Sequence, residues 1–231
     1  MNRRRLVQGG LGLAAMLWAR PSGAWDPWVA PDIPPEPGFL PLNGAILRLV
    51  REYDFGAANP YRWAPGMHVD GTTRDLSYGG VPLARASADG AIHCSGITFE
   101  VWLRALLRAG VPTDLSADAL LQLKEHWYVR GGDERGLARG LLDLRLGLSQ
   151  PTLDAMRPGD LIQFWRNSGK GHSAVVIEHR LNRAGGVRGL AVWSAQGISE
   201  GIGIRYVSVG PGEHQIAAGR WYGVRPVVPL V

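Results

Sequence analysis

The chain has 231 residues, a formal net charge of +5 and one cysteine. That length suffices for one domain with a sizeable hydrophobic core, and a lone cysteine excludes an internal disulfide. The basic charge would at first suggest a nucleic-acid partner, so where the charge lies along the chain decides how it is interpreted.

Residues 1–24 predict an export signal. Arginines at positions 3–5 precede an apolar run from Leu11 to Ala19, and small residues at 22–24 favour cleavage after Ala24. The consecutive arginines are similar to a twin-arginine signal, although an ordinary secretory signal fits them too. We therefore expect an exported protein that acts in the periplasm or outside the cell.

Cleavage changes the charge. The signal holds four arginines and no acidic residue, so its removal lowers the formal net charge from +5 to about +1. The high isoelectric point belongs largely to the signal, and we expect no nucleic-acid partner. The mature chain shows no second apolar span, and we expect no transmembrane segment in it. A Pro-rich arm is predicted at 25–42, followed by a single domain at 43–231.

The first half of the domain shows helical spacing. A short helix is expected within 43–58, and residues 59–92 indicate a long loop with a binding or lid role. Further helices are expected from Cys94 to a glycine cap at Gly110, from an N-cap at Ser116 through Trp127, and over 134–146. Glu100 and Arg104 are four residues apart, which predicts an ion pair on the polar face of the first of these helices.

The second half changes to strand patterns separated by tight turns. Strands are expected at 161–165, 172–178, 190–195, 202–209 and 220–228. Helices followed by closely spaced strands favour an α+β fold, with the helices packed on an antiparallel sheet.

Cys94 is the candidate nucleophile. A thiol on the first turn of a helix faces unpaired N–H groups and the positive end of the helix dipole, which favour the thiolate. An unpaired cysteine in an exported protein is open to oxidation, and its retention is more easily explained if it is reactive. The alternative is that Cys94 is a small buried apolar residue, as many free cysteines are.

His172 is the candidate base, since it begins a strand directly after a glycine turn. A thiol nucleophile needs a base within hydrogen-bond reach, and the imidazole needs a third group to orient it. An ordinary histidine at the end of a strand is the alternative. His68 and Asp70 could suggest a metal site, but two spaced ligands are too few, and we expect neither a metal nor another cofactor.

Three segments together resemble the NlpC/P60 cysteine peptidases. Cys94-Ser95-Gly96 is similar to their Cys-Ser-Gly motif at the start of a helix. Residues 157–164 resemble their Pro-Gly-Asp-Leu strand, and residues 171–177 their Gly-His strand. The resemblance covers about residues 75–226. It implies a papain-like fold in which a cysteine attacks amide bonds of peptidoglycan stem peptides, a histidine acts as its base, and a third polar residue orients the histidine.

The resemblance implies roles for further residues. Cys94 and His172 would be catalytic, and Gln196 would be the third member, with Ser194 on the same strand face as its rival. The family usually has an aspartate before the cysteine that holds the amine of the substrate, and here His93 takes that place.

Four residues are expected to bind the substrate. These are Tyr78, His93, Ser95 and Trp193. Tyr78 corresponds to a family tyrosine near the thiol and, with the backbone N–H of Cys94, would stabilise the oxyanion.

Two other functions stay open. A thiol acyltransferase or lipid amidase could use the same scaffold, and a hydrophobic groove beside Cys94 would favour it. A catalytically silent module that binds peptidoglycan through its tryptophans is the second alternative, and an unreactive thiol would favour it. The sequence also leaves open whether an activating partner exists.

Overall fold

The computed structural model describes residues 37–64, 69–110 and 115–230. The predicted export signal, most of the Pro-rich arm and His68 lie outside these residues. Among the described residues, no helix is both long and apolar enough to cross a membrane.

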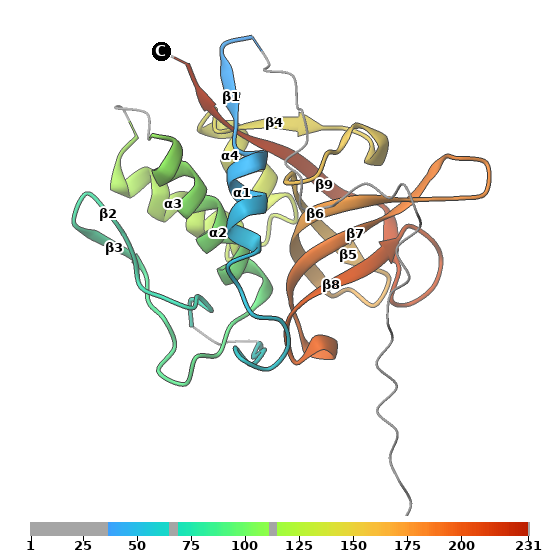
Figure 1. Cartoon of the computed structure of the whole chain (residues 1–231), viewed down its shortest axis with the longest axis horizontal. Helices are drawn as coiled ribbons and strands as arrows, with labels where there is room; N and C mark the ends of the chain where they lie inside the picture. Colours follow the sequence, from blue (N-terminus) through green and yellow to red (C-terminus); the bar gives the residue numbers. More distant parts are fainter. Residues whose placement is uncertain (1–36, 65–68, 111–114, 231) are drawn as a thin grey trace, which may run out of the picture.

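The structure is an α+β fold in which helices cover one side of a curled antiparallel sheet (Figure 1). The helices, within the described ranges, are α1 (Asn43–Val50), α2 (Cys94–Ala109), α3 (Ala117–Trp127) and α4 (Gly136–Asp143). The sheet has the order β1 (Phe39–Pro41), β9 (Ile216–Pro229), β5 (Leu161–Arg166), β6 (Gly171–Leu181), β7 (Val187–Gln196) and β8 (Gly201–Ser208), with β4 (Gly147–Gln150) also paired to β9. The predicted α+β class and the five predicted strands are confirmed.

Alternation along the strands separates two hydrophobic cores. Val175 and Trp193 face the helices and join the larger core, whereas Val176 and Val192 face the other side and join a smaller one. Neighbouring residues in a strand point to opposite faces of the sheet. Both faces carry apolar side chains because the helices cover one face and the sheet curls round the smaller core on the other. The face on which a residue lies therefore decides whether it can meet α2.

Helix α2 forms where its sequence predicts it. Three aromatic rings on or against it, Phe99, Trp102 and Trp127, lie 5.3–5.7 Å apart, and such pairs each contribute about 0.5–1.5 kcal/mol beyond burial. The helix ends at Gly110, whose φ of 99° is a conformation that glycine adopts at low cost. The N-cap at Ser116 of α3 is also confirmed, since its hydroxyl accepts from Ala119 N–H at 3.1 Å.

The segment 59–92 is mostly loop in its described part, as predicted, and it also contains the hairpin of β2 (Leu76–Tyr78) and β3 (Val81–Ala84). The end predicted for the last helix is wrong. Helix α4 stops at Asp143, and residues 147–150 pair with β9 instead of continuing the helix. Arg145 takes a positive φ of 57° between them, a conformation that cannot continue a right-handed helix.

The expected Glu100–Arg104 surface pair is also absent, and the reason is burial. Glu100 is fully buried and accepts hydrogen bonds of 2.7 Å from Tyr53 and from both the N–H and hydroxyl of Thr73. Arg104 instead pairs with Glu52. Glu100 thus holds the segment around Thr73 against α2, just ahead of the cysteine.

Candidate functional site

The first turn of α2 is held by a close fit between His93 and the preceding loop. His93 Nδ1 accepts from Gly96 N–H at 3.2 Å and so caps the helix, while Nε2 donates to the Val69 carbonyl at 3.1 Å. A Cβ at Gly71 would lie 2.3 Å from the His93 ring, and one at Gly96 would lie 2.1 Å from the Asp70 carbonyl oxygen. Only glycines allow this approach, which fixes the position of Cys94.

His93 therefore has a structural role in this arrangement, which differs from the substrate contact expected of it. Both ring nitrogens are occupied, its side chain is almost fully buried, and burial lowers its pKa. A neutral ring with no spare nitrogen cannot hold a substrate ammonium group. Ahead of it, Asp70 binds Lys124 at 2.9 Å and accepts from Arg85 N–H, so its carboxylate is also engaged.

Cys94 is nearly buried, with 8% of its surface exposed. Burial raises the pKa of the Cys94 thiol above its ordinary value and outweighs the opposite influence of the Ser173 and Ser95 groups and of the Arg166 charge. The expectation that the helix terminus would favour the thiolate is therefore wrong for this state. At neutral pH the group is a thiol, which needs a base to become a nucleophile.

The sulfur lies where two strands separate. The β6–β7 ladder ends at Val175 and Trp193, whereas β7 continues to pair with β8 as far as Gln196. Beyond that end, the Ser194 hydroxyl donates to the Ser173 carbonyl at 2.7 Å. The N–H and carbonyl of one strand residue point toward the same neighbouring strand. The Ser173 N–H, which lowers the pKa of Cys94, therefore faces the space that opens between β6 and β7, and the Cys94 sulfur lies on the α2 side of it.

His172 and Ser173 point to opposite faces of β6. The Ser173 hydroxyl faces α2, 3.5 Å from the Ser95 hydroxyl, which in turn is 4.0 Å from the Cys94 sulfur. His172 faces the smaller core, where its ring meets Phe164 edge-on with ring centroids 5.4 Å apart. Among the described residues no hydrogen bond joins the thiol to the imidazole. The thiol and the imidazole thus lie on opposite faces of the end of β6.

The His172 imidazole is a neutral base at physiological pH. Burial, and then the positive charge of Arg166, lower its pKa to about 3. Its Nε2 is enclosed and has no hydrogen-bond partner among the described residues. An unpartnered buried polar atom costs free energy, typically 1–3 kcal/mol, and structures rarely keep one without a reason.

Gln196 lies on the same face of the sheet as His172. Val176 of β6 and Val192 of β7 belong to the smaller core, and alternation along each strand puts His172 and Gln196 on that side as well. The Gln196 amide nitrogen is also enclosed and, within the described ranges, unpartnered. Ser194, the alternative third member, uses its hydroxyl on the Ser173 carbonyl. Of the two, Gln196 is the residue with an uncommitted polar group beside His172.

Two other residues predicted to bind substrate lie elsewhere. Trp193 is fully buried in the larger core with its ring 5.5 Å from that of Tyr53, which leaves no ring surface for a substrate. Tyr78 belongs to the β2–β3 hairpin, which packs on α3 on the side away from β6 and β7 (Figure 1). Ser95 stays at the site, beside the sulfur.

Sequence reasoning missed Tyr61 and Arg166. Tyr61 is half-buried, its pKa is raised by burial and by the Cys94 charge, and a Cβ at Gly197 would touch its ring at 3.6 Å. Its N–H bonds to the Glu200 carbonyl, which fixes it beside the end of β7. Tyr61 and Tyr128, and not Tyr78, are the tyrosines that the thiol influences, and the Tyr128 hydroxyl is already bonded to the Asp70 carbonyl. In the sequence, Tyr61 stands out only as part of the aromatic run 60–65 between two prolines. That run has no periodicity that would show which part of the chain it packs against.

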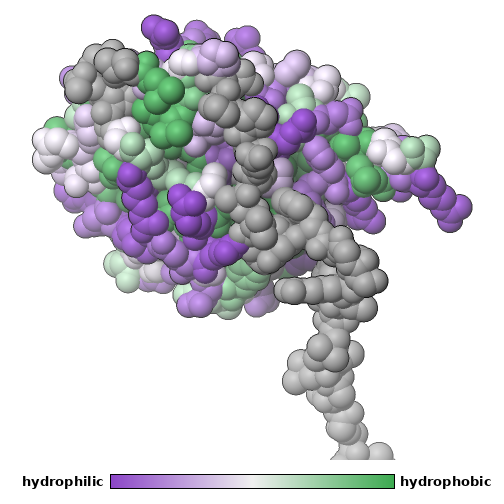
Figure 2. Space-filling model, turned by 45° about the horizontal axis from the view of Figure 1, so that its top comes forward, coloured by the Kyte–Doolittle hydropathy of each residue, from purple (hydrophilic) through white to green (hydrophobic). Residues whose placement is uncertain are grey.

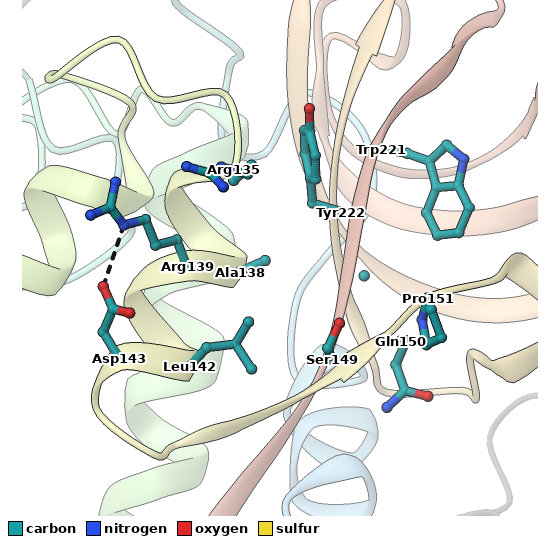
Figure 3. Close-up of a pocket in the computed structure, with 11 residues that line it drawn as sticks. Arg135, Ala138, Arg139, Leu142, Asp143, Ser149, Gln150, Pro151, Trp221 and Tyr222 are labelled. Atoms are coloured by element: carbon teal, nitrogen blue, oxygen red, sulfur yellow. Dashed lines mark ion pairs between the residues drawn. The ribbon is translucent and has the colours of Figure 1, made fainter.

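A separate cleft lies between α4 and the strands β4 and β9, and Figure 3 shows its lining. Its volume is about 290 Å³, and none of its lining residues belongs to the group around Cys94. Arg135 and Arg139 on its helical side pair with Asp133, and Arg139 also pairs with Asp143. Because these charges are already balanced within the chain, we place the candidate chemistry at Cys94 and not here.

No family model, curated protein or solved structure matches the chain.

Proposed function

We propose that the protein is a cysteine hydrolase that cleaves amide bonds in peptidoglycan stem peptides, on a papain-like scaffold of the NlpC/P60 type. The observation that carries the proposal is the arrangement around the β6–β7 gap. The Cys94 thiol lies on the α2 side of the end of β6, and His172, a buried neutral imidazole with an unpartnered nitrogen, lies on the other face of the same strand end, as does the uncommitted amide of Gln196 on β7. The three motif segments and the predicted export signal favour peptidoglycan as the substrate.

In the proposed reaction, His172 accepts the thiol proton as the Cys94 sulfur forms a bond to the scissile carbonyl carbon. The C–N bond then breaks, His172 gives the proton to the leaving amine, and a thioester remains on Cys94. Water adds to the thioester with His172 as base, and the carboxylic acid product and the free thiol are released. The imidazole is unprotonated at neutral pH, but a base with a pKa of about 3 accepts a proton weakly, so the scheme requires the pKa of His172 to rise toward neutrality when the substrate binds.

Gln196 acts as a positioning residue in this scheme. Rotation of its amide by half a turn presents the oxygen, which accepts from His172 Nε2–H and leaves Nδ1 for the thiol. For the oxyanion, the Cys94 N–H at the start of α2 is the first donor, and the hydroxyl of Tyr61 takes the role first expected of Tyr78. The Tyr61 hydroxyl stays protonated, since its pKa is raised, so it can donate.

The test is digestion of purified peptidoglycan by the protein from Trp25 onward, with the released fragments identified by mass spectrometry. Cys94→Ser is the close control, and Ser194→Ala is the matched control at a neighbouring buried hydroxyl. We expect stem-peptide fragments from the wild type and from Ser194→Ala, and none from Cys94→Ser. Equal release by Cys94→Ser would contradict the proposal, and binding to the wall without release would favour the silent module.

A further inference from the structure

Arg166 differs from the other buried or half-buried arginines of the described chain. Arg104, Arg220 and Arg225 each pair with a carboxylate, and Arg205 donates a hydrogen bond to the Ile198 carbonyl. The Arg166 guanidinium is half-buried, yet among the described residues it makes neither an ion pair nor a side-chain hydrogen bond. A charge withdrawn from water is costly unless an opposite charge or hydrogen bonds compensate it. Burial accordingly lowers the pKa of Arg166.

The guanidinium is fixed beside the candidate base. Its carbon lies 5.5 Å from the centre of the Phe164 ring, and the same ring meets His172 edge-on at 5.4 Å. The backbone of Arg166 is held in the β5–β6 turn, where its N–H donates to the Lys170 carbonyl and its carbonyl accepts from Gly169 N–H. The aromatic contact holds the cation in place while its N–H donors stay unused.

The acidic groups that influence the Arg166 charge are Cys94 and Tyr61, and both are neutral at physiological pH. The cation at the His172 end of the sheet thus has no opposite charge within the described part of the chain. A guanidinium binds a planar carboxylate with two parallel hydrogen bonds, a match that a lysine cannot provide.

We propose that Arg166 binds a free carboxylate of the substrate next to the scissile amide, so that the site selects acyl donors that carry a negative charge there. This proposal rests on the proposed function for the identity of the substrate. The preference for a negatively charged reaction partner is a property of the residues around the thiol, so it can be measured with small reagents and without any peptide. Bound carboxylate would supply the opposite charge that the free protein lacks.

The experiment compares two alkylating reagents of almost equal size, anionic iodoacetate and neutral iodoacetamide, in their reaction with Cys94 at pH 9. The measured quantity is the ratio of the two rate constants, in which differences in thiolate fraction between variants cancel. Arg180→Gln is the matched control, because Arg180 also lies over an aromatic ring and is on β6, but it is exposed and at the other end of the strand.

We expect the iodoacetate-to-iodoacetamide ratio to fall at least tenfold in Arg166→Gln, to fall less in Arg166→Lys, and to stay within twofold in Arg180→Gln. The wild-type ratio should also fall in 0.5 M salt, because salt screens the charge. An unchanged ratio in Arg166→Gln, or an equal loss in Arg180→Gln, would overturn the proposal, as would a thiol that reacts with neither reagent. Failure of peptidoglycan digestion with a ratio that still depends on Arg166 would refute only the proposed substrate.

Discussion

The structure has two clusters of buried polar side chains, one around Glu100 and one around His172 and Gln196. The clusters differ in how many of their polar atoms have hydrogen-bond partners. Around Glu100, the carboxylate accepts from Tyr53 and twice from Thr73, and Arg74 lies at 3.0 Å. Around the β6–β7 gap, His172 and Gln196 each keep an enclosed nitrogen without a partner among the described residues.

The comparison separates structural polar groups from functional ones. A network with every member bonded stabilises one conformation of the loop ahead of Cys94, and its removal should affect folding. Unsatisfied groups oppose folding, and the described chain has others, such as the indole nitrogens of Trp102 and Trp193. What distinguishes His172 and Gln196 is that both can exchange or hold a proton at one place on the sheet. Figure 2 shows one face of the molecule, on which hydrophilic residues surround a few groups of hydrophobic ones.

The largest expected effect follows from replacement of His172. His172→Gln should lower the rate of amide hydrolysis by about 10³-fold or more, because the thiol then has no base. The free energy of unfolding, measured by urea denaturation, should fall by less than about 1.5 kcal/mol, since the enclosed nitrogen made no hydrogen bond. A large loss of stability together with retained hydrolysis would place His172 in the structural class instead.

Glu100→Ala should show the opposite pattern. Its loss leaves Tyr53 and Thr73 with buried groups that no longer have an acceptor, and we expect the free energy of unfolding to fall by about 3 kcal/mol. Urea denaturation measures this change. Activity per folded molecule should stay within about threefold of the wild type, as Glu100 does not face the gap, and a selective loss of turnover in the folded protein would contradict this assignment.

Gln196 and Ser194 distinguish the two possible third members. Gln196→Ala should lower kcat about 10–100-fold, corresponding to about 1.4–2.7 kcal/mol, with little change in KM, because it orients the base and does not bind substrate. Ser194→Ala should leave kcat nearly unchanged and reduce stability slightly through the lost bond to Ser173. The reverse result in steady-state kinetics would assign the role to Ser194.

The dependence of stability on pH provides a smaller but specific effect. The pKa of His172 is about 3 in the folded protein, whereas an exposed histidine has a pKa near 6.5. Between these values the unfolded state binds the proton and the folded state does not, so stability falls as the pH falls from about 6.5 toward 3. The slope from this group is at most about 1.4 kcal/mol per pH unit.

This dependence can be assigned by comparison of variants. His93 is also buried with a lowered pKa and adds to the wild-type slope, so the informative quantity is the difference between the wild type and His172→Gln. The variant should show a flatter decline between pH 6 and 4 in urea denaturation. If the free energy of unfolding declined equally with pH in the wild type and in His172→Gln, His172 would be protonated in the folded protein, and its surroundings would differ from those described.

Local patterns predicted much of the fold. Features that depend only on residues close together in the sequence could be predicted directly. They include helix α2, its end at Gly110 and the N-cap at Ser116. The β2–β3 hairpin was missed because Pro82 and several glycines hide its alternation. The burial of Glu100 was missed because Tyr53 and Thr73, which satisfy it, are distant in the sequence.

The site was predictable in its residues but not in its geometry. Motif spacing brought Cys94, His172 and Gln196 together as candidates, but only the register shows that His172 faces away from α2. Tyr61 reaches the thiol through pairing with the segment after β7, and no local pattern encodes that contact. The pKa of Cys94 depends on enclosure by loops and strands, which a helix terminus alone does not determine.

The central claim is that Cys94 forms a covalent acyl intermediate with the help of His172. The most direct measurement mixes the protein with peptidoglycan fragments, quenches with acid within milliseconds to seconds, and determines the mass of the peptide that contains Cys94. The account predicts a thioester adduct of the acyl fragment in the wild type that is absent from Cys94→Ser and at least about 100-fold slower to form in His172→Gln. Product formation with no adduct at any time, or an adduct that forms equally fast in His172→Gln, would contradict it.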